Sequence, residues 1–428
     1  MIRLYDFDEV RPEEILNRDI RAEANVEAAV DAIIADVRAR GDAALIDYAA
    51  KFDHAQLDSV QVSAQEIEDA FALLEKDGPE FITTLKMAAE NIRHFHEQQL
   101  HKNFVMTDRP GIVLGQKYTP IQRAGVYVPG GTAAYPSTVL MDVIPAKVAG
   151  VQQIVMMTPA GRDGKVNPNI LAAAVIAGID CIFKSGGAQA IAALAYGTES
   201  VPAVDKIVGP GNIYVATAKR KVFGKVGIDM IAGPSEILVL ADGSCNPAWV
   251  AADLLSQAEH DRLASPVLVT DSEDLAKAVQ AELEVQIPQL PRAAIARASV
   301  DDNGKIILCT DLHKAIEACN IIAPEHLEVC VEDPFGVLNE IRNAGSIFLG
   351  RNVPEALGDY FAGPNHTLPT SGTARFSSPL GVDDFVKKSS FIYYTRDALE
   401  AVAPRIADFA EREGLHAHAR SVTIRYEK

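Results

Sequence analysis

A carboxylate and an imidazole stand side by side at Glu325 and His326, in a segment that leads into an apolar run. Glutamate and histidine together are the usual pair for proton transfer near neutral pH. Adjacent residues of a strand point to opposite faces, so we expect both side chains to reach one pocket only if Pro324 opens a short helical turn. Taken alone, an exposed polar turn is the simpler interpretation of this segment.

Two further pairs of side chains could bind a metal ion. Gln257 and His260 lie three residues apart at the end of a segment that Asn246 can cap as a helix, which puts both on one face. Asp359 and His366 flank a glycine-bounded loop, and aspartate and histidine are common zinc ligands. Taken singly, each pair is explained better by a hydrogen-bonded helix end or by a surface loop.

The end of the chain adds one more acid and two more histidines, at Glu413, His416 and His418. Histidine near the carboxyl end of a helix interacts favourably with the helix dipole, so a solvated helix end is the alternative interpretation of this segment. Three further histidines lie on a polar segment that we expect to be the solvated face of a helix: His94, His96 and His101.

The elements that must position these side chains appear as a regular alternation. Short, nearly all-apolar runs occur at residues 124–128, 152–158, 180–184, 206–208, 236–241, 266–270, 305–309 and 346–349. Strands that are covered on both faces have this composition. Alanine-rich helical segments lie between most of these runs, so the sequence predicts an α/β fold with parallel sheets. The first hundred residues show helical spacing, and the segment after Gly381 breaks the alternation and predicts a helical tail.

Glycine and proline cluster where the predicted strands end, in Pro129-Gly-Gly, Gly186-Gly187 and Gly209-Pro-Gly-Asn212. In parallel α/β sheets the ligand crevice lies at the carboxyl ends of the strands, so a cofactor would bind at these turns. The Gly-x-Gly-x-x-Gly fingerprint of ordinary dinucleotide sites is absent from the sequence. Each cluster taken alone indicates only a tight turn that requires a positive φ.

The composition limits the classes of function. Of 428 residues, 58 are acidic and 40 are basic, and the formal charge of -18 disfavours binding to nucleic acids or to anionic membranes. Five scattered cysteines without a Cys-x-x-Cys pair indicate neither a disulfide framework nor a thiolate zinc site. No apolar stretch has the length of a membrane span, and the acidic amino terminus is unlike a signal peptide. We therefore expect a cytoplasmic protein.

Seven strings of the sequence, in this order, resemble the signature of the histidinol dehydrogenase family. They are Tyr127-Val-Pro-Gly-Gly-Thr-Ala-Ala-Tyr-Pro-Ser137, Gly186-Gly-Ala-Gln-Ala-Ile-Ala-Ala-Leu-Ala-Tyr-Gly197, Val208-Gly-Pro-Gly-Asn212, Asp229-Met-Ile-Ala-Gly-Pro-Ser-Glu236, Leu255-Ser-Gln-Ala-Glu-His260, Ala323-Pro-Glu-His-Leu-Glu328 and Gly363-Pro-Asn-His-Thr-Leu-Pro-Thr370. The resemblance covers nearly the whole chain.

This resemblance implies a role for each candidate residue. Glu325 and His326 match the family's acid–base pair. The implied ligands of one Zn2+ per subunit are Gln257, His260, Asp359 and His418, and His416 could compete with the last of these. The implied substrate contacts are Ser235, Gln257, His260, His326, Asp359, His366, Glu413 and His418. The implied contacts with the dinucleotide NAD are Tyr127, Gln189 and Asn212.

The family fold implies two Rossmann-like domains whose parallel sheets lack the usual glycine fingerprint. The expected divisions are an N-terminal arm at 1–22, a first α/β domain at 23–123 with 237–315, a second α/β domain with the cofactor turns at 124–236 with 316–380, and a tail at 381–428. The resemblance also implies a homodimer in which the tail contributes to the partner's active site. The sequence alone fits a tail that packs on its own subunit equally well.

The same resemblance implies the activity, which is oxidation of L-histidinol to L-histidine through bound histidinal with two NAD, the last step of histidine biosynthesis. A related zinc and NAD enzyme acting on another polar alcohol, such as a sulfonated diol, is the nearest alternative. Such a relative should lack some of the positions His366, Glu413 and His418, which are all present. A zinc hydrolase is a further alternative, disfavoured by the glycine turns and by the absence of a His-Glu-x-x-His motif.

Overall fold

The computed structural model describes residues 1–10, 15, 24–130, 134–179 and 181–427, and the chain divides into two compact units. The first unit comprises Met1–Gln99 and Ile121–Phe385, and the second comprises Leu100–Pro120 and Val386–Lys428. Residues 11–14 and 16–22 of the expected N-terminal arm, residues 131–133 of the first signature string and residue 180 of an expected strand lie outside the described residues.

Five parallel strands form one sheet of the first unit, in the order β6 (Cys181–Lys184), β5 (Gln153–Thr158), β4 (Arg123–Tyr127), β7 (Lys206–Val208) and β8 (Gly227–Ile228). Helices connect the successive strands: α6 (Pro136–Ala149), α7 (Pro168–Ala177), α8 (Gly187–Tyr196) and α9 (Ile213–Val222). Each helix returns the chain to a parallel strand, which is the connection that the alternation of strand and helix predicted.

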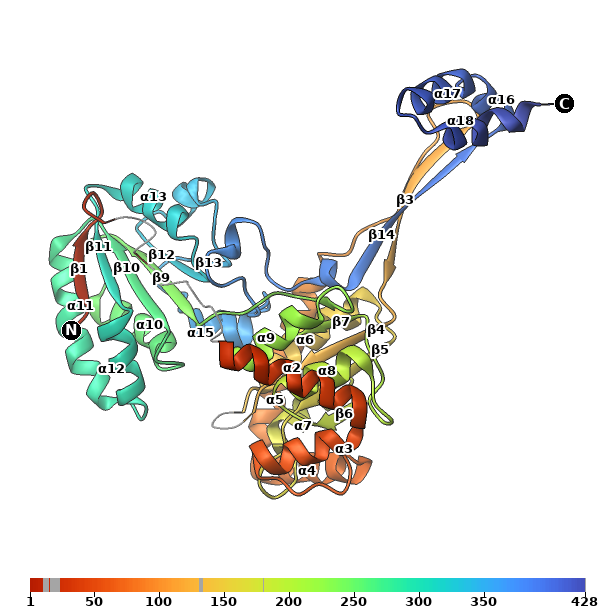
Figure 1. Ribbon diagram of the computed structural model, residues 1–428. Coiled ribbons are helices and arrows are strands. Elements are labelled where there is room, and N and C mark those ends of the chain that lie inside the picture. Colours follow the sequence, from red (N-terminus) through yellow and green to blue (C-terminus); the bar gives the residue numbers. More distant parts are fainter. Residues whose placement is uncertain (11–14, 16–23, 131–133, 180, 428) are drawn as a thin grey trace. The chain divides into compact units, whose positions relative to one another are not determined.

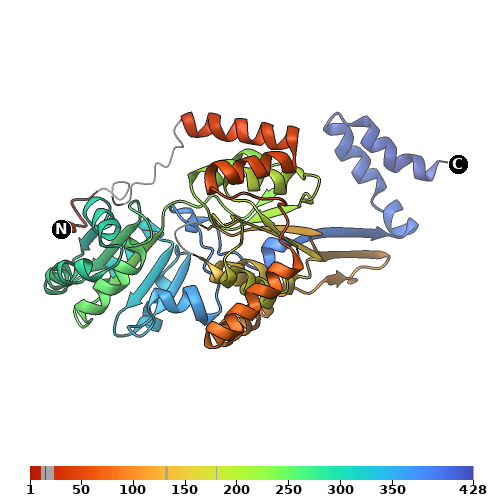
Figure 2. The same cartoon turned by 90° about the horizontal axis from the view of Figure 1, so that it is seen from below.

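Among the described residues of the first hundred, four α-helices pack on the helices of this sheet: α2 (Ala24–Arg40), α3 (Asp42–Tyr48), α4 (Ala64–Asp77) and α5 (Pro79–Glu97). Helix α2 packs against α8 and α9, whereas α4 packs on α7 and α5 on α6 (Figures 1 and 2, red and orange). The expected solvated face is wrong for His96, which is fully buried on α5. Ile92, one turn earlier on the same face, is buried too, and its carbonyl oxygen lies 2.8 Å from His96 Nδ1.

Six parallel strands form the other sheet of the first unit, in the order β1 (Arg3–Asp6), β11 (Lys305–Leu308), β10 (Ser265–Thr270), β9 (Glu236–Ala241), β12 (His326–Cys330) and β13 (Ser346–Leu349). Four helices of ten or more residues cover this six-stranded sheet: α10 (Pro247–Ala258), α11 (Glu273–Gln286), α12 (Ala293–Asp302) and α13 (Leu312–Ile322) (Figure 1). Val239 packs with α10 to α12 and the next residue, Leu240, packs with α13. Because both of its faces are buried, β9 is apolar from Ile237 to Ala241, after the buried Glu236 at its start.

The strand pairing groups the chain differently from the expected divisions. Strands β9 to β11, which fall mainly in the expected segment 237–315, share a sheet with β12 and β13 from the segment 316–380. The link is the parallel pairing of β9 with β12, two strands about ninety residues apart in sequence that lie directly side by side. The start of the expected N-terminal arm forms β1, which pairs with β11 along the edge of the same sheet.

The described part of the second unit contains a small antiparallel sheet, three α-helices and the short 3-10 helix η7 (Ile424–Tyr426). Strand β14 (Val386–Tyr394) pairs along its whole length with β3 (Ile112–Pro120), which also pairs with β2 (Phe104–Met106). The expected tail begins with a short 3-10 helix, η6 (Val382–Phe385), and its α-helices start only at residue 396: α16 (Arg396–Glu400), α17 (Ala403–Arg412) and α18 (His416–Thr423). Residues 386–394 between them form the strand β14, because aromatic and β-branched side chains dominate there.

The predicted fold class, α/β with two parallel sheets, is confirmed. None of the helices formed by the described residues is long and apolar enough to span a membrane.

Candidate active site

The pair Glu325 and His326 lies where β12 begins, beside the first residue of β9. Glu325 Oε2 accepts a hydrogen bond of 2.9 Å from the backbone N–H of Glu236, and His326 Nδ1 lies 2.9 Å from the backbone carbonyl oxygen of the same residue. The helical turn that we expected at Pro324 is not formed. Instead, Ala323 ends α13 in a left-handed conformation (φ 50), and a bend at the strand entrance brings both side chains to Glu236.

The contact with Glu236 assigns the tautomer of His326. A carbonyl oxygen only accepts hydrogen bonds, so Nδ1 carries the proton when the imidazole is neutral, and Nε2 is the basic atom. Nε2 is buried, lies 3.7 Å from Asp359 Oδ1 and 3.9 Å from Glu355 Oε1, and has no hydrogen-bond partner among the described residues. The imidazole therefore presents one free nitrogen to the centre of the site.

Neighbouring carboxylates control the charge of this pair. Burial lowers the pKa of His326, but Glu325, Asp359 and Glu355 outweigh that effect and raise the pKa to about 10. Burial raises the pKa of Glu325 to about 8, although the adjacent imidazolium opposes the shift. A cation bound at Asp359 would offset the same carboxylates and lower the pKa of His326 toward that of a useful base.

Glu355 is a site residue that sequence reasoning missed. It starts α15 (Glu355–Leu357) one helical turn before Asp359, which lies in η4 (Gly358–Ala362), and residues four apart on a turn share a face. The four-residue spacing of Glu355 and Asp359, directly after Pro354, was the sequence feature that could have identified Glu355 as a site residue. Ser256 Oγ donates to Glu355 Oε2 (2.9 Å), while Oε1 is buried without a hydrogen-bond partner among the described residues. Burial and the charge of Asp359 raise the pKa of Glu355 to about 7.

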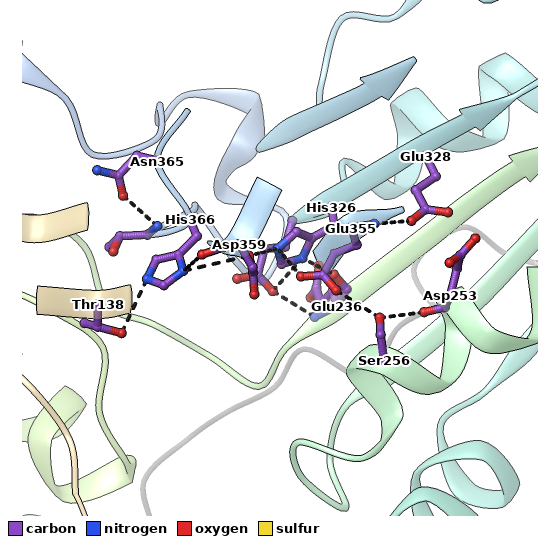
Figure 3. A network of polar contacts seen from close by, with 12 residues as sticks. Thr138, Glu236, Asp253, Ser256, His326, Glu328, Glu355, Asp359, Asn365 and His366 are labelled. Carbon is purple, nitrogen blue, oxygen red and sulfur yellow. Dashed lines mark hydrogen bonds and ion pairs between the residues drawn. The ribbon is translucent and has the colours of Figure 1, made fainter. Parts of the chain in front are cut away.

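His366 approaches Asp359 from the loop that follows η4. Its Nδ1 lies 3.1 Å from the backbone carbonyl oxygen of Asp359, and its Nε2 lies 3.3 Å from Thr138 Oγ1 on α6 (Figure 3). Burial raises the pKa of Asp359, but His326 and His366 outweigh it and hold the pKa of Asp359 below its ordinary value. A cavity of about 270 Å³ is lined by Asp359 and His366 together with mainly apolar side chains.

Helix α10 brings the predicted pair Gln257 and His260 to the same region. Asn246 caps this helix through Ala248 N–H, as predicted, and Gln257 is buried in its last turn. Ser256, the residue before Gln257, contacts Glu355. His260 follows the helix and is exposed, yet surrounding protein atoms lower the pKa of its imidazole against the opposing charge of Asp359.

Three described side chains lie close enough to hold a metal ion together. The ligand atoms of His326, Glu355 and Asp359 are all within 4.8 Å of one another, and Figure 3 shows the three side chains pointing toward one point. This group shares Asp359 with the predicted zinc ligands, and His260 is near enough for the charge of Asp359 to act on its imidazole. Imidazole and carboxylate are donors that zinc accepts, and two orphaned buried atoms face the centre, so the residues fit a zinc ion. The full predicted ligand set stays a prediction.

The predicted cofactor residues lie at the carboxyl ends of the five-stranded sheet. Tyr127 is the last residue of β4, and its hydroxyl accepts a hydrogen bond of 3.1 Å from Gly187 N–H. Gln189 is buried in the first turn of α8. Asn212 caps α9 by accepting from Tyr214 N–H (3.0 Å). Gly209 has φ 115, and a Cβ there would collide with the carbonyl oxygen of Tyr127, so this turn requires glycine.

The remaining predicted residues occupy different parts of the chain. Ser235 directly precedes β9, is half-buried, and its carbonyl oxygen accepts from Ser265 N–H. Glu413 ends α17 of the second unit. His418 and its possible competitor His416 lie on α18 of that unit, and all three of these tail side chains are exposed.

A family model described as histidinol dehydrogenase matches residues 16–426 of the chain. The histidinol dehydrogenase of Geobacter sulfurreducens is 57% identical over 96% of each chain, and that of Syntrophotalea carbinolica is 55% identical over 99% of each chain. The crystal structure of histidinol dehydrogenase from Elizabethkingia anophelis superposes with a TM-score of 0.94 and 39% identity, covering 99% of this chain and 98% of that chain.

Proposed function

This chain belongs to the histidinol dehydrogenase family, and from that premise we propose that it oxidises L-histidinol to L-histidine in two successive hydride transfers to NAD. The observation that carries this proposal is the buried pair Glu325 and His326, held by one backbone residue and facing the carboxylate of Asp359. A base, a second carboxylate and a candidate metal ligand lie together, as an alcohol oxidation followed by an aldehyde oxidation requires.

Binding and orientation fall to the residues around Asp359. Gln257, His260, Asp359 and His418 of the partner subunit would hold zinc, while His366 and Glu413 would contact the substrate. When bound, zinc would supply a Lewis acid that anchors nitrogen atoms of the substrate, and NAD would supply the hydride acceptor. Fixing the carbinol carbon beside His326 lowers the entropy cost of reaction, because both reacting groups are then in place.

In the first half-reaction, His326 Nε2 takes the hydroxyl proton as the carbinol carbon loses a hydride, which leaves the aldehyde histidinal. In the second, Glu325 takes a proton from water as the water oxygen bonds to the aldehyde carbon. The resulting hydrate anion transfers a second hydride to NAD and becomes the acid. Keeping histidinal bound prevents the loss of a reactive aldehyde between the two halves.

We expect Glu325→Gln to impair the second half-reaction far more than the first. A carboxyl whose pKa is raised to about 8 is a competent base for water near neutral pH, whereas glutamine accepts no proton. Histidinal oxidation should slow by about 100-fold or more, while the first hydride transfer from histidinol changes by less than about tenfold. Single-turnover NADH formation from histidinol and from histidinal measures the two halves. Equal losses for both substrates would reject this division of roles.

The proposed function is tested by counting NADH formed per L-histidinol consumed by the pure protein loaded with zinc. We expect two NADH and one histidine per histidinol, because both oxidations occur before release. One NADH with free aldehyde in solution would contradict the second step. Turnover of another polar alcohol, such as a sulfonated diol, without turnover of histidinol would favour the nearest alternative.

We also propose that two chains associate and that each tail completes the other chain's site. Glu413 and His418 are exposed on the second unit, and large apolar side chains of the same unit, Ile392 and Phe409, are 74% and 67% exposed. Exposed apolar side chains beside proposed ligands are expected where another chain packs, and exchange of a tail between two identical chains is a common route to a dimer.

A further inference from the structure

Asp53 lies at the carboxyl edge of the five-stranded sheet, although it comes from the helical segment that precedes the sheet in sequence. It is the last residue of η1 (Ala49–Asp53). A few residues later the chain runs antiparallel along β6, with Val62 N–H donating to Ile182 O (2.9 Å) and Lys184 N–H donating to Val60 O (2.6 Å). Because this pairing is antiparallel, the residues before Val60 continue past the carboxyl end of β6.

The packing of this segment confirms its position. Ala49, Ala55 and Leu57 form a small buried cluster with Ala160, which lies in the loop after β5. That loop also approaches the backbone, because a Cβ on Gly164 would lie 3.0 Å from the carbonyl oxygen of Gln56. Asp53 is thus held against the same edge of the sheet that carries the proposed cofactor turns.

The carboxyl group of Asp53 has an unexplained buried oxygen. Its Oδ2 is inaccessible to solvent and has no hydrogen-bond partner among the described residues. Burial raises the pKa of Asp53 to about 6, so the group is still ionised above neutral pH. Burial raises the pKa of Tyr127, and the charge of Asp53 adds to this shift. The Tyr127 hydroxyl accepts a hydrogen bond from the N–H of Gly187 in the next glycine turn. A buried acceptor without a donor leaves one hydrogen bond unmade, and a hydroxyl group of a ligand at the proposed cofactor turns would supply it.

The positively charged side chain at the carboxyl end of β6, Lys184, is already neutralised by an ion pair. Lys184, the last residue of β6, forms an ion pair of 2.5 Å with Glu66 and is 8% exposed. A phosphate group placed beside Asp53 would therefore meet an anionic carboxylate, with this nearby lysine already neutralised. Hydroxyl groups, which donate hydrogen bonds and carry no charge, suit the position.

We propose that the Asp53 carboxylate accepts hydrogen bonds from ribose hydroxyls of NAD and excludes the 2′-phosphate of NADP. The inference rests on the proposed function, since it assigns the cofactor preference of that same site. In ordinary dinucleotide folds an acid about 20 residues after the glycine turn has this role. This chain lacks the glycine fingerprint, and here the acid comes from upstream of the sheet, so motif spacing could not find it.

The experiment compares binding of NAD and NADP by isothermal titration calorimetry for the wild type, Asp53→Asn and Asp58→Asn. Asparagine keeps the shape of Asp53 but removes its charge. The ratio of NAD to NADP affinity should fall by about 10- to 100-fold in Asp53→Asn, the range expected for hydrogen bonds to a charged group. Asp58 is an exposed acid of the same segment, so Asp58→Asn makes the same charge change and should leave the ratio unchanged.

Thermal unfolding checks that each variant is folded, and Asp53→Ser serves as a second variant if Asp53→Asn is unstable. An unchanged affinity ratio in the folded Asp53 variants, with NAD still bound, would overturn the inference and leave the proposed function intact. An equal change in Asp58→Asn would also overturn it, because the effect would then be one of net charge. A wild type that binds neither dinucleotide and forms no NADH would refute both proposals.

Discussion

His326→Asn is expected to lower kcat for histidinol by about 100- to 10,000-fold, the range typical for removal of a general base. Asparagine can still donate a hydrogen bond to the carbonyl of Glu236, so the substitution preserves the anchor that Nδ1 provides. It removes Nε2, the atom that lies 3.7 Å from Asp359 Oδ1 and that we propose as the proton acceptor. Steady-state kinetics with saturating NAD measure the loss, and zinc content measures whether the site still binds metal.

The matched control is His313→Asn, the same substitution at a histidine whose side chain is 79% exposed and whose imidazole contacts Glu340. It should leave kcat and zinc content unchanged. Retention of more than about a tenth of the wild-type kcat in a His326→Asn protein that contains zinc would show that another group accepts the proton.

Mixing His326→Ala with His418→Asn is expected to restore activity to about a quarter of wild-type sites, starting from two variants that are each nearly inactive. If the tail serves the partner subunit, a mixed dimer has one site with both lesions and one site with none. Random reassociation makes about half of the dimers mixed, and each of them carries one intact site. The two proteins are dissociated, mixed in equal amounts, reassociated and assayed for NADH formation.

The control for this experiment mixes His326→Ala with Glu325→Gln, which both alter the body of the chain. No mixed dimer then contains an intact site, so activity should stay at the level of the separate variants. If mixed dimers of His326→Ala and His418→Asn are present by mass but remain inactive, the tail serves its own chain and the shared site is excluded.

Patterns that depend on a few neighbouring residues were sufficient to predict the elements. The apolar run at 236–241 became β9, buried on both faces, and Asn246 caps α10 as expected. These features are local, because helix capping and the burial of a strand depend on residues that are only a few positions apart in the sequence. The same local information placed the glycine turns at strand ends, where Tyr127 and Gly209 meet.

Partners that are distant in sequence could not be predicted from such patterns. An all-apolar strand shows that both faces are covered but not which strands lie beside it. The pairing of β9 with β12 therefore crosses the expected domain divisions, and the pairing of β3 with β14 turned part of an expected helical tail into a strand. Both pairings join segments whose contact depends on the complete fold.

The site shows the same limit at the level of single residues. Their adjacent positions suggested that Glu325 and His326 act together, but no local pattern indicated that Glu236 of a neighbouring strand orients both. Family resemblance implied roles for residues of the matched strings and for Asp359, Glu413 and His418 outside them, but none for Glu355. Glu355 lies outside those strings, and its approach to His326 depends on the contact of α15 with β12, where Glu355 N–H donates to the Glu328 carboxylate.

The orientation of Glu325 and His326 depends on main-chain atoms, which every amino acid at position 236 except proline would provide. Evolutionary drift or protein engineering at this position thus cannot remove the two anchors by exchanging the side chain, although the Glu236 carboxylate has its own contact with Ser371 N–H. A one-residue insertion or deletion in β9 would act differently, since it shifts the strand against β12 and turns each residue to the opposite face. Both anchors would then be lost in a single event, so the site tolerates substitution at 236 far better than any change in the length of this strand.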